Sequence, residues 1–154
     1  MQSAAQDAKM NLFKAGAAMF LVACFTGLAI SIVPWAHRAH AIGAHLNAAS
    51  FSPVLIGFGV LVGEIGRKFN ESELSLLVRS AIWGTSFAVI SKLLMGLMGT
   101  SSPFMMPAAS EGAVEAAWVS GLGVARYVPV AMLFMGGIMV IVAGSLLVKG
   151  IFSE

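Results

Sequence analysis

Residues 128–148 read VPVAMLFMGGIMVIVAGSLLV and include no charged side chain. An α-helix rises ~1.5 Å per residue, so about 20 such residues cross the ~30 Å hydrocarbon layer of a bilayer. Four apolar runs of about this length occur, near residues 12–33, 44–63, 75–98 and 124–148. They predict an all-α fold in which residues 1–154 form a single integral membrane domain, a bundle of four transmembrane helices.

The composition also indicates a membrane protein. Of the 154 residues, 58% are hydrophobic and 10% are charged, whereas an ordinary soluble domain carries about a quarter charged residues. So few charges cannot cover a water-facing surface, which excludes a soluble globular domain. The net charge of +2 is spread over the flanks of the spans, without the basic stripe of a nucleic-acid binder. We therefore expect a lipid bilayer around the chain and no nucleic acid as a partner.

Positive charges between the spans predict an orientation. Cytoplasmic loops of membrane proteins carry an excess of Lys and Arg. The N-terminal tail, the second loop and the C-terminal end hold six such residues, and the first and third loops hold two. The six are Lys9, Lys14, Arg67, Lys68, Arg79 and Lys149, and the two are Arg38 and Arg126. We expect both termini in the cytoplasm and the protein in a bacterial inner membrane.

Small residues recur in the second and fourth predicted spans. Gly59 and Gly63 have GxxxG spacing, and Gly136 and Gly137 are adjacent. Small side chains let helix backbones approach closely in a membrane, where water supplies no hydrophobic drive between helices. The glycines serve either packing within one subunit or a subunit interface, and the sequence pattern leaves both alternatives open.

One charged side chain lies well inside a predicted span. Lys92 is about six residues, or ~9 Å, from the outer end of the third span by helical rise. A charge in hydrocarbon is costly and marks a candidate site. Lys92 either extends to the outer interface or needs an anionic partner, for which Glu111, Glu115 and the propionates of a haem are candidates.

All three histidines of the chain fall within nine residues. Imidazoles gathered in so short a stretch suggest a metal ion or a haem iron. We expect His37 and His40 in the first loop, as interfacial residues that titrate there. His45 begins the second span, where either a ligand role or a hydrogen bond at the helix start would explain it.

No phosphate-binding loop, dinucleotide glycine pattern, GxSxG, HExxH or CxxC motif occurs in the sequence. The remaining candidate is a polar pocket at the outer ends of the second and third spans, roofed by the third loop. Its predicted residues are His45, Asn47, Ser50, Lys92, Glu111, Glu115 and Arg126.

Several short motifs, in this order, resemble the small four-helix membrane isomerases of the hydroxylaminobenzene mutase and styrene oxide isomerase family. The motifs cover most of the chain, although each is short and apolar. They are AHL at 44–46, LIGFG at 55–59, WGT at 83–85, MMPAA at 105–109 and EAA at 115–117.

The resemblance implies an oligomeric bundle that rearranges a small apolar aromatic substrate, such as an arylhydroxylamine or an aryl epoxide, without net redox change. In the styrene oxide isomerase branch a histidine early in the second span holds a haem b, whose iron acts as a Lewis acid. His45 matches that position, so the resemblance implies haem b as cofactor and His45 as its iron ligand. Beside it, we predict Lys92, Glu115 and Asn47 as catalytic residues.

The chain also departs from the styrene oxide isomerase pattern. That branch has an asparagine six residues after the ligand histidine, where this chain has Phe51. It also has a tyrosine in the third span, whereas the only tyrosine here is Tyr127, at the start of the fourth. We therefore keep, as the alternative to an isomerase, a non-enzymatic subunit or a haem-binding or assembly component of a larger membrane complex.

Overall fold

The computed structural model describes residues 2–99 and 119–153. The elements are α1 (Gln2–Ile32), α2 (Arg38–Ile65), η1 (Gly66–Lys68), α3 (Glu71–Met98), η2 (Val119–Tyr127) and α5 (Val128–Phe152). All of them are helical, and four helices are long and apolar enough to cross a membrane. The predicted all-α fold of four transmembrane helices is confirmed, and the chain is a membrane-embedded bundle.

The first two long helices begin earlier than the predicted apolar runs. α1 starts at Gln2 and α2 at Arg38, six or more residues before the predicted boundaries of 12 and 44. A 28-residue helix such as α2 is ~42 Å long at ~1.5 Å per residue, which exceeds the ~30 Å hydrocarbon layer. Helical backbone therefore continues through the polar flanks, because a helix satisfies its backbone groups whether or not its side chains are apolar.

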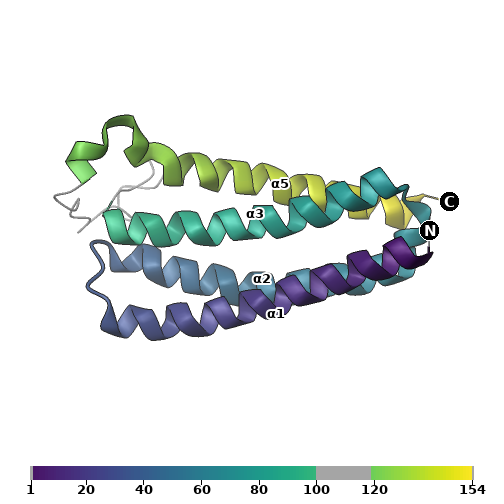
Figure 1. Ribbon diagram of the computed structural model, residues 1–154, viewed down its shortest axis with the longest axis horizontal. Helices are drawn as coiled ribbons and strands as arrows, with labels where there is room; N and C mark the ends of the chain where they lie inside the picture. Colours follow the sequence, from purple (N-terminus) through teal and green to yellow (C-terminus); the bar gives the residue numbers. More distant parts are fainter. Residues whose placement is uncertain (1, 100–118, 154) are drawn as a thin grey trace.

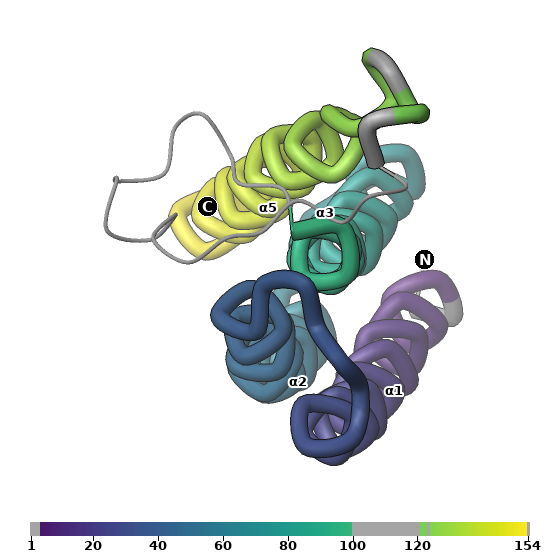
Figure 2. Tube along the Cα trace, turned by 90° about the vertical axis from the view of Figure 1, so that its left-hand side faces the viewer, coloured from purple at the N-terminus to yellow at the C-terminus, as the bar shows by residue number. Residues whose placement is uncertain are grey.

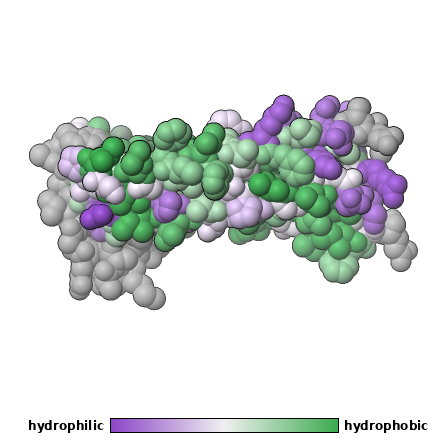
Figure 3. Space-filling view, turned by 90° about the horizontal axis from the view of Figure 1, so that it is seen from below, coloured by the Kyte–Doolittle hydropathy of each residue, from purple (hydrophilic) through white to green (hydrophobic). Residues whose placement is uncertain are grey.

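The long helices run along one another, and both chain termini lie at the same end of the bundle (Figure 1). We call this the terminal end, and the opposite end, which holds the turn between α1 and α2, the loop end. α1 packs along α2, α5 packs along α3, and α2 and α3 lie between these outer helices (Figure 2). Hydrophilic residues gather at the terminal end, and hydrophobic surface covers much of the length beyond it (Figure 3).

The GxxxG pair of the second span, Gly59 and Gly63, packs within the chain. A Cβ atom on Gly59 would lie 2.7 Å from the ring of Phe13, and one on Gly63 would lie 3.0 Å from the side chain of Lys9. Both neighbours belong to α1. The GxxxG pair thus seats α1 against α2, which is the packing alternative of the sequence interpretation.

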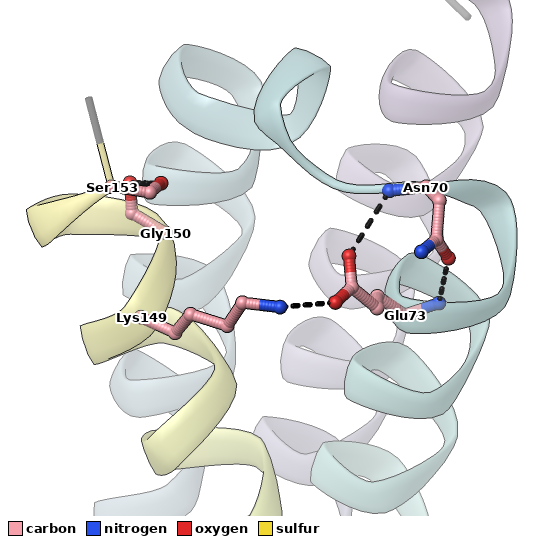
Figure 4. Close-up of polar contacts among 5 residues, drawn as sticks. All are labelled: Asn70, Glu73, Lys149, Gly150 and Ser153. Carbon is pink, nitrogen blue, oxygen red and sulfur yellow. Dashed lines mark hydrogen bonds and ion pairs between the residues drawn. The ribbon is translucent and has the colours of Figure 1, made fainter.

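At the terminal end, a capping box begins α3. The Asn70 side-chain oxygen accepts a hydrogen bond from the Glu73 backbone N–H at 2.8 Å, and a Glu73 carboxylate oxygen accepts one from the Asn70 N–H at 3.2 Å. The other Glu73 oxygen pairs with the Lys149 ammonium of α5 (Figure 4). Glu73 therefore caps its own helix and also links α3 to α5.

Asn70→Ala is expected to lower the free energy of unfolding by about 1 kcal/mol, because the first-turn N–H groups of α3 lose their side-chain acceptor. Ser72→Ala is the matched control, since Ser72 is an exposed residue in the same turn and does not cap the helix. Unfolding of both variants in detergent, followed by circular dichroism, compares them. Equal stability of the two variants would contradict the capping role.

Candidate functional site

The turn at the loop end fixes the start of α2 against the end of α3. The Trp35 indole N–H donates to the Ala29 carbonyl of α1 at 3.1 Å. The backbone N–H of His37 donates to the Gly96 carbonyl of α3 at 2.9 Å. A Cβ atom on Gly96 would lie 3.1 Å from the Trp35 ring and 3.2 Å from the Ala41 nitrogen. The missing side chain at Gly96 therefore lets the first turn of α2 contact α3.

His37 and His40 form a buried pair at this contact. Their rings lie 4.3 Å apart between centroids and are tilted by 37°, and their side chains are 5% and 2% exposed. His37 lies in the turn before α2, as expected, whereas His40 lies within the helix, so the expectation of a loop position is wrong for His40. Burial of both rings also differs from the interfacial placement that was expected. α2 already begins at Arg38, so His40 lies in its first turn, and protein covers both rings.

Two ring nitrogens of this pair have no hydrogen-bond partner. They are Nδ1 of His37 and Nε2 of His40, and both atoms are buried. Buried polar atoms are nearly always paired in folded proteins, so an unpaired one needs an explanation. One feature of the sequence indicates that the two rings lie close together: residues three positions apart at the start of a helix point to the same side.

His45 faces α1. Its Nδ1 lies 2.8 Å from the Ala23 carbonyl oxygen, and its half-buried ring packs where Gly27 has no side chain, since a Cβ there would lie 3.0 Å from Cε1. A carbonyl only accepts, so Nδ1 carries the proton and Nε2 carries the lone pair. The hydrogen bond thus joins two helices, and the ring plays no part in capping the start of α2.

Lys92 lies on the other side of α2. Its Cδ atom is 3.8 Å from the position that a Cβ on Gly43 would occupy, and the residue is half-buried. Among the described residues, Lys92 has no ion pair. The described carboxylates are Asp7, Glu64, Glu71 and Glu73, all near the terminal end.

The predicted haem ligand and the two described catalytic candidates do not converge on one side of α2. Gly43, beside Lys92, and His45 are two positions apart, which is about 200° around a helix of 3.6 residues per turn. Asn47 follows Gly43 by four residues and therefore lies on the Lys92 side. His45 is thus separated from Lys92 and Asn47 by the body of α2.

The other predicted pocket residues take different positions. Ser50 is exposed, and Phe51 is half-buried against the core cluster. The Arg126 guanidinium donates to the Tyr127 hydroxyl at 2.8 Å. Glu111 and Glu115 lie outside the described residues.

Among the described residues, no group of three or more His, Cys, Asp or Glu side chains is placed to hold a metal ion. A single histidine suffices for a haem iron, whose porphyrin supplies the other ligands. A separate cavity of about 360 Å³ lies at the terminal end between α1 and α3. Its polar lining residues are Asp7, Asn11, Glu71, Ser75 and Arg79.

Among the described residues, the loop end therefore contains two histidine sites. One is His45 with its α1 carbonyl, and the other is the His37–His40 pair with Lys92 nearby. In the comparisons with known proteins, no family model, curated protein or solved structure matches the chain.

Proposed function

We propose that the protein is a membrane-embedded isomerase that rearranges a small apolar aromatic substrate, such as an arylhydroxylamine or an aryl epoxide, with haem b bound through His45. The observation that supports this best is the hydrogen bond from His45 Nδ1–H to the Ala23 carbonyl at 2.8 Å. It holds the ring against α1 and leaves the Nε2 lone pair available for a metal.

The arrangement around His45 fits an iron ligand. A histidine that binds a metal usually donates its other ring N–H to a carbonyl or carboxylate, which fixes the tautomer and raises the basicity of the ligand nitrogen. Among the described residues, Nε2 of His45 has no hydrogen-bond partner. Ile42 and Leu46 flank His45 on α2 with 41% and 57% exposure, so the surface beside the ring is apolar, as a haem face requires.

The chemistry divides between the cofactor and the chain. A bound haem iron supplies a Lewis acid that polarises a C–O or N–O bond. His45 anchors the iron, and the apolar side chains around it bind an aromatic ring and keep water from the rearranging substrate. An intramolecular rearrangement conserves atoms and electrons, so the reaction needs no reductant or second substrate.

Lys92, Asn47 and Glu115 keep their proposed catalytic roles as separate hypotheses. Within one chain, Lys92 and Asn47 lie on the opposite side of α2 from His45. They would contact a substrate bound at His45 only if the substrate extended around α2, or if Lys92 and Asn47 of another subunit lay next to His45. The exposed apolar side chains of α1, such as Phe25 and Leu28 at 68% and 62% exposure, suit contact with lipid as well as with another subunit, and the homo-oligomer stays a separate part of this proposal.

His45→Ala is expected to abolish haem binding, because no other described side chain occupies its place. The wild type, His45→Ala and the control Ser50→Ala are purified in detergent from haem-replete cells, and their visible absorption spectra are compared. We expect a Soret band in the wild type and in Ser50→Ala, and none in His45→Ala. A wild type without a Soret band would exclude the haem mechanism.

Turnover distinguishes the isomerase from the alternative function. The haem-loaded protein is incubated with phenylhydroxylamine and, separately, with styrene oxide, and products of unchanged molecular formula are sought by mass spectrometry. A Soret band without such a product from these or related substrates would favour a haem-binding component of a larger complex.

A further inference from the structure

The His37–His40 pair plays no part in the proposed haem site. The two rings lie at the N-terminus of α2, His37 is its N-cap residue, and its side chain makes no capping hydrogen bond. His37 Nδ1 and His40 Nε2 remain buried and unpaired. Two unsatisfied ring nitrogens at one contact leave hydrogen-bonding capacity that a ligand group could use.

The charges at the loop end determine whether that ligand is an anion or a cation. The N-terminus of a helix carries about half a positive charge, and α2 is 28 residues long. The Cδ atom of Lys92 lies 3.8 Å from the position that a Cβ on Gly43 would occupy, and Gly43 follows His40 by three residues on the same side of α2. The described carboxylates are all near the terminal end. This positive field opposes a metal cation and favours an anion.

The ring nitrogens can serve an anion as donors. A neutral imidazole carries a hydrogen on one ring nitrogen and a lone pair on the other. When His37 is protonated at Nδ1 and His40 at Nε2, both unpaired atoms become N–H donors. An oxygen anion that accepts from them would satisfy both atoms and would neutralise the charge of Lys92.

We infer that His37, His40 and Lys92 form a binding site for an anionic oxygen group, a carboxylate or a phosphate, at the N-terminus of α2. A small-molecule anion and the phosphate of a lipid headgroup share this chemistry. The site lies beside α3, whereas His45 faces α1, so anion binding does not depend on haem.

The test uses the full-length protein labelled with ¹⁵N-histidine, in micelles of a neutral detergent. Its three histidines give three sets of ring signals, which single substitutions assign. Benzoate, inorganic phosphate and phosphatidylglycerol are titrated separately at constant ionic strength. We expect saturable shifts of the His37 and His40 ring nitrogens with at least one probe, while the His45 signals stay in place.

Lys92→Met is expected to weaken the binding of the probe about tenfold, because the charge-assisted contact is lost. Lys14→Met removes the same charge from an exposed position of α1 toward the terminal end and is expected to leave the affinity unchanged. Unchanged His45 signals in both variants verify that the bundle is intact.

The outcomes separate the possible ligands. Shifts with benzoate or phosphate indicate a free anion, and shifts with phosphatidylglycerol alone indicate a lipid headgroup. Absence of saturable shifts with all three probes, or equal affinity in Lys92→Met, would overturn the inference. It would also be overturned if a Glu111→Gln, Glu115→Gln double variant moved the His37 and His40 signals without added anion, because the chain's own carboxylates would then fill the site.

Discussion

Gly136→Ala is expected to destabilise the bundle by about 1–3 kcal/mol, the usual range for inserting a methyl group into a close-packed contact. A Cβ atom on Gly136 would lie 2.7 Å from the Gly84 carbonyl oxygen and 3.2 Å from the Ala88 nitrogen. Both are backbone atoms of α3, so no side-chain rotation can relieve the overlap. α3 and α5 must move apart, which disrupts the interface between them.

Gly137→Ala provides the matched control, because a Cβ atom on Gly137 would meet nothing within 4 Å among the described residues. Alanine is more favourable than glycine inside a helix by about 1 kcal/mol. The two neighbouring substitutions should therefore change stability in opposite directions. Thermal unfolding of the detergent-purified variants measures both, and a stabilising effect of Gly136→Ala would refute the close contact between α3 and α5.

The four spans were predictable from the sequence because insertion into lipid depends mainly on length and composition. The run at 128–148 carries no charge, and the structure makes it the body of α5. Which glycine faces which helix was not predictable. Gly136 and Gly137 are adjacent glycines in the same apolar run, so the sequence does not distinguish them. The rotation of α5 about its axis determines that Gly136 lies against Gly84.

The candidate site was predictable only in part, because the sequence identifies His45 but does not show which groups of the other helices contact it. His45 stood out as a histidine at the start of an apolar run, and the structure gives it a defined partner in α1. That partner is the Ala23 carbonyl, which no sequence pattern marks because every residue has one. His37 and His40 were assigned to a loop since they precede the apolar run. His37 does lie in the turn, as the N-cap residue, but α2 begins at Arg38, so His40 lies in the helix, and both rings are buried.

Gly27→Val is expected to displace the His45 ring without unfolding the bundle. A Cβ atom on Gly27 would lie 3.0 Å from Cε1 and 3.1 Å from Nδ1 of His45, closer than ordinary van der Waals contact. Unlike the neighbours of Gly136, these atoms belong to a side chain that can rotate, so the ring moves and the helices stay in place. The hydrogen bond from Nδ1 to the Ala23 carbonyl is then lost.

Loss of that hydrogen bond should weaken haem binding about 10- to 100-fold if His45 is the iron ligand, since a hydrogen bond that orients a metal-binding histidine contributes that much to metal affinity. Gly57→Val is the control, because a Cβ atom there would meet nothing within 4 Å among the described residues. Haem titration measures affinity, and the ¹⁵N signal of His45 Nδ1 reports the hydrogen bond independently. If Gly27→Val changes the Nδ1 signal but leaves the haem affinity at the wild-type value, His45 is anchored for structural reasons and the iron ligand lies elsewhere.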